Sequence, residues 1–117
     1  MKREVEIHLK GWGHEIWIMN FEKYCGKILV FNSGKKCSWH YHKEKEETFY
    51  VAKGSFKILY GPGDDLRQAE SLILSPGEAF HVMPTLRHQM IALEDSELFE
   101  ISSTHNESDS YRVEKGD

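Results

Sequence analysis

The sequence lacks most of the features that mark other large classes of protein. Its two cysteines do not make a disulfide scaffold, and no segment is of low complexity. No basic run is longer than Lys35-Lys36 and the formal net charge is −4, so nucleic acid is not an expected partner. No run approaches the roughly 20 apolar residues of a membrane-spanning helix, and the segment 1–6 lacks the apolar core of a signal peptide. We therefore expect one soluble, cytoplasmic domain, residues 1–117, with no membrane partner.

What the sequence does contain is a repeated alternation of apolar and polar residues with a period of two, which is typical of β-strands. Examples are Val5-Ile7-Leu9, Ile28-Val30 and Phe56-Ile58-Tyr60. Turn-forming residues separate these runs at intervals of about 8 to 12 residues, as in sandwiches and barrels. The turns are expected at 11–13, 32–34, 53–54, 61–65, 75–77, 84–85 and 94–96. The pattern predicts an all-β fold of about nine or ten strands, a single antiparallel β-barrel of the jelly-roll type. The polar residues from His105 onward are expected to cross the barrel surface or to fray.

Histidines and a glutamate form a spaced pattern near the middle of the chain, which reads Gly34-x5-His40-x-His42-x4-Glu47-x6-Gly54. In a strand, His40 and His42 point to one face and Tyr41 points to the other. Glu47 has the wrong parity for the same strand. We therefore interpret Lys43, Glu44, Lys45 and Glu46 as a solvated turn that resets the register. Imidazole and carboxylate groups together suit a first-row divalent ion, and four such ligands on an octahedral ion leave two positions open.

This spacing resembles the first motif of the cupin family, in which every fixed position is filled here. The second cupin motif, Gly-x5-Pro-x-Gly-x2-His-x3-Asn, is matched by Gly77, by His88 and, one place late, by Pro84. The glycine position of that motif is occupied by Thr85. The resemblance implies a cupin barrel that binds one divalent transition metal, which is Zn, Mn, Fe, Co or Ni. The ligands that it implies are His40, His42, Glu47 and His88.

Within the cupins, five segments resemble the type II phosphomannose isomerases and related sugar-phosphate isomerases. They are the segments Lys10–Glu15, Glu22–Leu29, Phe80–Val82, Glu94–Ser103 and Asp109–Glu114. The resemblance implies a sugar or sugar phosphate as the ligand and an aldose–ketose isomerisation as the reaction. In such a reaction the metal polarises the carbonyl group and a base moves a proton between two carbons. His40 stands where these isomerases usually carry glutamine, and their terminal arginine has no counterpart here, so we expect weak or no mannose-6-phosphate isomerase activity.

Additional residues are candidates for catalysis and binding. His81 is a candidate base because it is the additional histidine closest to the ligands in sequence, although a structural histidine is the other interpretation. Phosphate recognition requires fixed cations, and the candidates are Lys10, Arg87 and Arg112. Two further functions stay open. One is a carbohydrate-binding cupin without turnover, and the other is an iron-dependent dioxygenase that uses the same ligands.

The cysteines and the aromatic residues complete the set of expectations. Cys25 and Cys37 are interpreted as small apolar fillers in preference to catalytic thiols, and strand parity would turn Cys37 away from the metal. Trp39 and Tyr41 flank His40 on the opposite parity, so they are expected outside the metal cavity. Aromatic residues on the outside of a small barrel are commonly covered by a second subunit, which predicts a homodimer. The alternative is cover by the chain's own amino-terminal strand or tail.

Overall fold

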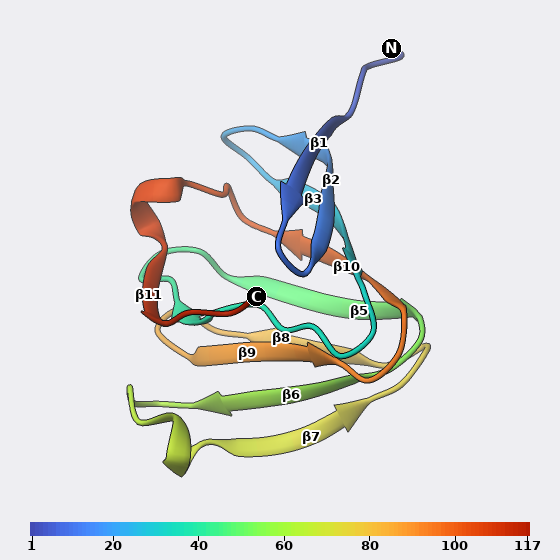
Figure 1. The fold of residues 1–117 in the computed structure, drawn as a ribbon. Helices are drawn as coiled ribbons and strands as arrows, with labels where there is room; N and C mark the ends of the chain where they lie inside the picture. Colours follow the sequence, from blue (N-terminus) through green and yellow to red (C-terminus); the bar gives the residue numbers. More distant parts are fainter.

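The fold consists of two antiparallel β-sheets that face each other, as Figure 1 shows for a computed structural model that describes all 117 residues. The six-stranded sheet has the order β1-β2-β3-β10-β5-β8, and the five-stranded sheet has the order β11-β4-β9-β6-β7. The strand bounds are β1 Glu6–Lys10, β2 Gly13–Asn20, β3 Cys25–Phe31, β4 Trp39–Tyr41, β5 Glu47–Lys53, β6 Phe56–Gly61, β7 Glu70–Leu74, β8 Ala79–Val82, β9 Arg87–Ala92, β10 Ser96–Ser102 and β11 Tyr111–Glu114. Two short 3-10 turns, Leu66–Gln68 and Glu107–Asp109, are the remaining elements. The predicted all-β jelly-roll fold is confirmed.

The strands form where the sequence alternates, and the turns form where small and polar residues interrupt it. In β3 the buried residues alternate with half-buried ones along the whole strand. Each of the predicted turns separates two strands. Gly34, Gly54 and Gly77 have φ angles of 80°, 80° and 87°, a backbone conformation that glycine adopts without strain. No helix of the structure is long and apolar enough to cross a membrane.

The core lies between the two sheets, where side chains of one parity from each strand meet. Its buried members are mainly aliphatic and aromatic: Trp12, Leu29, Phe31, Cys37, Phe49, Val51, Phe56, Ile58, Leu74, Val82, Met90, Ala92 and Leu98. These residues fill one end of the space between the sheets. Charged and imidazole side chains occupy the other end, where the cavity described below opens.

The carboxyl-terminal segment crosses the barrel surface, which was the first of the two expectations for it. After the 3-10 turn Glu107–Asp109 the chain forms β11, which pairs with β4 so that Arg112 lies opposite His40. Asp117 then accepts a hydrogen bond from the Lys36 amide at 2.8 Å and donates its own amide to the Lys36 carbonyl at 2.8 Å. The tail is therefore hydrogen-bonded to the rest of the chain, and its strand β11 forms one edge of the five-stranded sheet.

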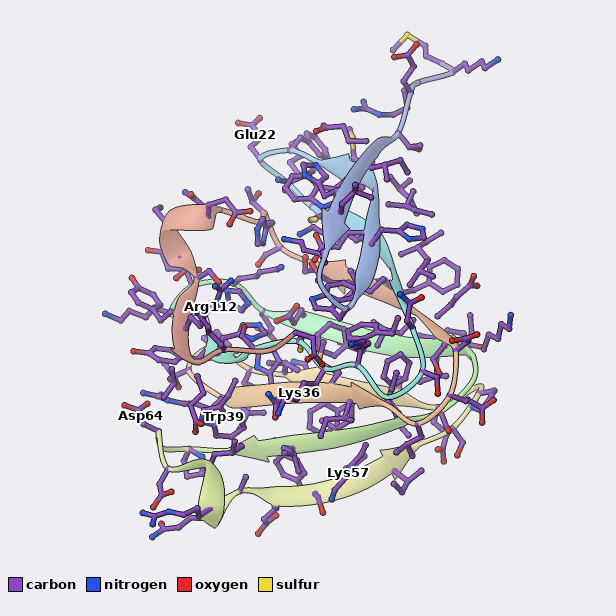
Figure 2. The ribbon with its side chains drawn as sticks, in the orientation of Figure 1. Glu22, Lys36, Trp39, Lys57, Asp64 and Arg112 are labelled. Carbon is purple, nitrogen blue, oxygen red and sulfur yellow. The ribbon has the colours of Figure 1, made fainter.

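Other parts of this chain lie against the aromatic residues beside His40. Trp39 is fully buried, and its indole nitrogen donates a hydrogen bond to the carbonyl of Asp64 at 2.8 Å (Figure 2). Tyr41 stacks on Tyr111 of β11 with ring centroids 5.1 Å apart, and the Arg87 guanidinium lies 3.6 Å from its ring centroid. The tail covers Tyr41, as in the alternative given above, whereas the loop that contains Asp64 lies against Trp39. Trp39, which is fully buried, is therefore not part of a dimer interface, and the homodimer itself stays a prediction.

Candidate metal centre

Three histidines meet at the charged end of the space between the sheets. His40 lies in β4 and His88 lies in β9, directly opposite each other in the antiparallel register. His42 follows β4 by one residue and keeps the same parity as His40. One nitrogen from each of the three imidazoles lies within 4.8 Å of the others, an arrangement that can hold a metal ion.

Each of these imidazoles is fixed by a backbone carbonyl. The Nδ1 atoms of His40, His42 and His88 lie 2.9 Å from the carbonyl oxygens of Ser38, Asp109 and Leu86, respectively. Because a carbonyl oxygen only accepts, Nδ1 must donate, and the Nε2 atom of each neutral ring keeps its lone pair. Metal-binding histidines are commonly oriented by a partner of this kind. Burial, followed by the proximity of His88, holds the pKa of His40 well below its usual range, which favours the neutral ligand form.

Glu47, the first residue of β5, lies beside two of the three histidines from the facing sheet. Its Oε2 atom lies 3.4 Å from His42 Nε2 and 3.2 Å from His88 Nε2. Glu47 Oε2 and His88 Nε2 are both buried and make no hydrogen bond. A buried polar atom without a partner costs about 1–3 kcal/mol, so two of them facing each other require an explanation. A divalent cation bound by both atoms would satisfy them, and the residues present therefore fit the metal that the fold family implies.

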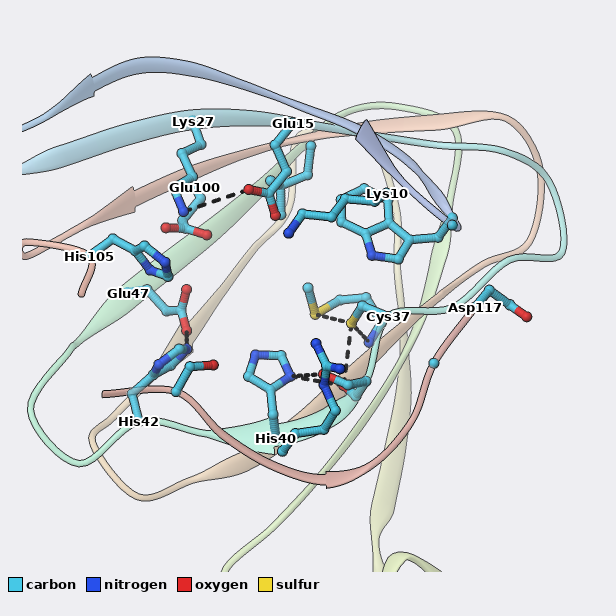
Figure 3. Close-up of a pocket in the computed structure, with 18 of the residues that line it drawn as sticks. Lys10, Glu15, Lys27, Cys37, His40, His42, Glu47, Glu100, His105 and Asp117 are labelled. Atoms are coloured by element: carbon cyan, nitrogen blue, oxygen red, sulfur yellow. Dashed lines mark hydrogen bonds and ion pairs between the residues drawn. The ribbon is translucent and has the colours of Figure 1, made fainter. Parts of the chain in front are cut away.

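A cavity of about 510 Å³ opens over His40, His42 and Glu47. Figure 3 shows these residues on one side and Glu15, Lys27 and Glu100 on the other. Its charged lining residues come from both sheets and from the tail: Lys10, Glu15, Lys27, Lys45, Glu47, Glu100, Glu107, Arg112, Lys115 and Asp117. The cavity is therefore strongly polar and connects the candidate metal centre to the protein surface.

Lys45 forms ion pairs with two strands of the six-stranded sheet beside the candidate metal centre. Its Nζ lies 2.7 Å from Glu100 Oε2 and 3.6 Å from Glu47 Oε1, with the three side chains almost completely buried. Burial opposes the charged form of Lys45, but the carboxylates of Glu100 and Glu47 outweigh this effect and raise its pKa. The interpretation of Lys43, Glu44, Lys45 and Glu46 as a solvated turn is therefore wrong for Lys45, although the other three are exposed.

The cations predicted to bind an anion lie in different places. Lys10 and Arg112 line the cavity. Arg87 does not, because its guanidinium stacks over Tyr41 and donates to Asp64 Oδ1 at 2.9 Å on the far side of β4. Lys115, which the sequence analysis did not single out, lines the cavity as well.

His81 lies away from the cavity. It occupies β8 on the outer face, is exposed, and pairs with Glu46. The three histidines whose ring nitrogens cluster do not include it. This position favours the other interpretation of His81, a structural histidine, over that of a base in the cavity.

Cys37 lines the cavity, contrary to the expectation from strand parity. The expectation failed because β4 begins only at Trp39, so no strand periodicity applies to residue 37. Burial raises the pKa of the Cys37 thiol to about 12, and its Sγ lies 4.0 Å from the Met90 sulfur. The thiol is thus protonated at neutral pH and packs as part of the core. Cys25 is also buried and free.

Buried charges at core positions were not recognised from the sequence. Lys27 shares the inward parity of Leu29 and Phe31 in β3, and Glu100 shares that of Leu98 in β10. Lys27 and Glu100 lie opposite each other in the register, and Lys27 also pairs with Glu15 at 3.8 Å. The sequence did contain a signal for these residues, because each has the same parity as the apolar residues of its strand. A charged residue at such a core position indicates a buried charge that is paired.

Comparison with known proteins places this fold and site in a family. The cupin domain family matches residues 27–104, more than half of the chain. The chain belongs to the cupins. No curated protein matches it in sequence.

Solved structures share the cupin fold at low sequence identity. KdgF from Halomonas sp. is 20% identical over 91% of this chain and 90% of that chain, with a TM-score of 0.74. CapF, a capsular polysaccharide assembling protein from Staphylococcus aureus, is 16% identical over 97% of this chain, with a TM-score of 0.79. Oxalate decarboxylase from Bacillus subtilis is 16% identical over 93% of this chain, with a TM-score of 0.80. This cupin spans 33% of CapF and 30% of oxalate decarboxylase. The oxalate decarboxylase has Mn(II) centres.

Proposed function

We propose that this cupin binds one divalent transition metal through His40, His42, Glu47 and His88, and that it acts on a sugar that carries an anionic group, such as a sugar phosphate. The metal proposal is supported by the three carbonyl-oriented imidazoles and by the two unpaired buried atoms that face each other. The size and polarity of the adjoining cavity suit a small, oxygen-rich ligand.

The preference for an anion is supported by three cations of the cavity lining that form no ion pair. Three lining carboxylates have cationic partners, since Glu15 pairs with Lys27 and both Glu47 and Glu100 pair with Lys45. Glu107 and Asp117 accept hydrogen bonds from His105 and from the Lys36 amide. The three cations at the mouth, Lys10, Arg112 and Lys115, form no ion pair. Unpaired cations around a cavity attract anions and can bind phosphate or carboxylate oxygens.

The strand register supports recognition of both ends of one ligand. Arg112 lies opposite His40 in the β11–β4 pair, so both side chains project from the same face. Neighbouring strands are about 4.8 Å apart, a separation that a sugar ring spans. A ligand can therefore present vicinal oxygens toward the histidines while its anionic group reaches Arg112.

Isomerase-like chemistry requires a proton-transferring group beside the ligand. A bound divalent metal supplies Lewis-acid polarisation of a carbonyl oxygen. Glu100 lines the cavity, whereas His81 does not. Burial, followed by repulsion from Glu47, raises the pKa of the Glu100 carboxyl, which brings it closer to that of an effective acid or base. Glu100 is thus the better candidate for the proton transfer of an aldose–ketose isomerisation. A cytoplasmic location, expected from the sequence, fits the two free cysteines.

The proposal is tested by metal analysis together with calorimetric binding of mannose 6-phosphate, mannose and inorganic phosphate. Wild-type protein should hold about one metal per chain, and His42→Ala with His88→Ala should hold none. Arg112→Ala should weaken binding of the sugar phosphate about tenfold or more, because it removes a hydrogen-bonded charge pair. Arg67→Ala, which changes an exposed arginine outside the cavity, is the matched control and should bind as wild type.

Two results would contradict the proposal. Full metal occupancy in the double histidine variant would refute the ligand assignment. Metal-loaded protein that bound neither sugar nor sugar phosphate at millimolar concentration would refute the carbohydrate function. If Arg112→Ala left the affinity unchanged, the metal alone would be the recognition element.

A further inference from the structure

Lys45 presents its ammonium group to three acceptors in a buried setting. Glu100 Oε2 lies at 2.7 Å, His105 Nδ1 at 2.9 Å and Glu47 Oε1 at 3.6 Å from Nζ. The contacts with Glu100 and His105 are within hydrogen-bond distance, whereas Glu47 Oε1 is held by charge attraction at the longer distance. The side chain is only 2% exposed, which leaves water little opportunity to compete.

The partners of Lys45 are themselves held in place. His105 Nε2 lies 3.0 Å from Glu107 Oε1, so Nε2 donates to that carboxylate and Nδ1 accepts from Lys45. The backbone of His105 is fixed at both of its polar groups by the side-chain amide of Asn20, at 2.9 and 3.0 Å. Glu100 also accepts a hydrogen bond from Ser102 Oγ at 3.3 Å. The ammonium therefore sits in a frame formed by β2, β10 and the segment that follows β10.

The two oxygens of Glu47 are assigned to different neighbours. Oε1 faces Lys45 at 3.6 Å, while Oε2 faces His42 and His88 at 3.4 and 3.2 Å and makes no hydrogen bond. One oxygen of this carboxylate therefore faces the two histidines, while the other faces the Lys45 ammonium.

We propose that Lys45 is a positioning residue of the metal centre, which holds Oε1 of Glu47 so that this carboxylate binds the metal through Oε2 alone. This inference rests on the proposed metal site. Three imidazoles and one carboxylate oxygen make four ligand atoms. A six-coordinate ion then keeps two positions for a bound ligand. A carboxylate that bound through both oxygens would fill one of these places and would hinder chelation of two vicinal oxygens.

The experiment compares cobalt(II)-loaded proteins, because the visible absorption of Co(II) reports the number and geometry of its ligands. Lys45→Met removes the ammonium while keeping a side chain of similar length. Lys45→Met combined with Glu100→Gln also removes the carboxylate charge that would otherwise be buried without its partner, so this pair carries the test if the single variant does not fold. Lys43→Met is the matched control, since Lys43 belongs to the same turn and is exposed.

Wild-type protein and Lys43→Met should bind about one Co(II) per chain with the same spectrum. The Lys45 variants should show a changed spectrum, with weaker bands if Glu47 now offers both oxygens, or a Kd for Co(II) that is changed about tenfold or more, as for other residues that orient metal ligands. A folded Lys45 variant with the wild-type spectrum and wild-type affinity would overturn the inference and leave the metal site intact. Absence of Co(II) binding by the wild-type protein would instead refute the proposed metal site.

Discussion

The imidazoles of the candidate metal centre are oriented by hydrogen bonds from Nδ1 to backbone carbonyls of residues in loops. Asp109 is one of them, since its carbonyl accepts the hydrogen bond from His42 Nδ1. Its carboxylate accepts hydrogen bonds from the amides of Lys43 at 2.8 Å, Glu44 at 3.1 Å and Lys45 at 3.0 Å. One side chain of the tail therefore fixes the backbone of the turn that separates His42 from Glu47, and couples the tail to the site.

The first residue-scale prediction concerns the charge of Asp109. Burial works against the carboxylate, but the hydrogen bonds from Lys43, Lys45 and Glu44 outweigh it and lower the pKa of Asp109 below the ordinary value of 3.8. The folded state thus favours the ionised form, and this contribution to stability is fully present above the ordinary pKa. It is lost as the pH falls through the lower pKa of the folded state. Asp109→Asn should therefore reduce the free energy of unfolding at pH 7 by about 2 kcal/mol.

The measurement is urea unfolding of wild-type protein and Asp109→Asn at pH 7 and at several values below pH 4. The difference in the free energy of unfolding between the two proteins should shrink as the pH falls, because the wild-type carboxylate becomes protonated. Glu44→Gln, which neutralises an exposed carboxylate in the same turn, should unfold as wild type at each pH. An equal difference between wild type and Asp109→Asn at pH 7 and in acid would show that the charge of Asp109 is not what stabilises the turn.

At the scale of elements, the turns between strands determine which side chains face the cavity. The β5–β6 turn passes through Gly54, whose φ is 80°. A Cβ atom at this position would lie 2.7 Å from the Asp95 carbonyl oxygen and even closer to Ser96 Oγ. Gly54→Ala should lower the free energy of unfolding by at least about 2 kcal/mol, through the left-handed backbone and the steric clash together.

Thermal unfolding of three proteins tests this prediction. Gly63→Ala is the matched control, because Gly63 also lies in a turn but a Cβ atom there meets nothing within 4 Å. The control should differ from wild type by less than about 0.5 kcal/mol. Similar stability of Gly54→Ala and Gly63→Ala would mean that the β5–β6 turn can relax to accept a side chain.

The elements were predictable from the sequence because their signal is local. Alternation at a period of two and the intervening glycines and polar residues predicted most strands and most of the turns between them, but not the turn at 21–24 or the strand β11. The positions of His40, His42, Glu47 and His88 followed from spacing in the same way. Lys45 was different: it lies among charged neighbours in a turn, and its burial arises from contacts with Glu100 and His105, which are distant in sequence.

Strand parity predicted the wrong direction for a residue outside any strand, and it did not predict which segments cover an outward face. Cys37 faces the cavity because it precedes β4 and so has no strand partner. Trp39 and Tyr41 do point away from the cavity, as parity predicts, but the 61–69 loop and β11 cover them. Which segment covers an outward face depends on the path of the whole chain, and a local pattern holds no information about it.

At the scale of the whole molecule, the outer face of the six-stranded sheet is apolar and uncovered. The register places Ile7, Ile16, Ile28, Phe99 and Tyr50 in one row across β1, β2, β3, β10 and β5. These residues have the parity opposite to the core residues Leu29 and Leu98, so they face outward. Around the row, Leu9 is 84% exposed and Ile101 is 64% exposed. A continuous apolar face of this kind marks an interaction surface, and a symmetric dimer is the commonest closed assembly.

We therefore keep the prediction of a homodimer but assign it to this outer face and not to Trp39 and Tyr41. Light scattering at micromolar concentration should give twice the chain mass of 13.7 kDa. Ile7→Glu combined with Ile101→Glu should give the monomer mass, because burying a carboxylate without a partner in an apolar interface opposes association. Ile73→Glu is the control, since Ile73 is equally exposed at 55% but lies on β7 of the other sheet. A wild-type mass near 13.7 kDa would exclude the dimer, and dissociation by Ile73→Glu alone would move the interface to the five-stranded sheet.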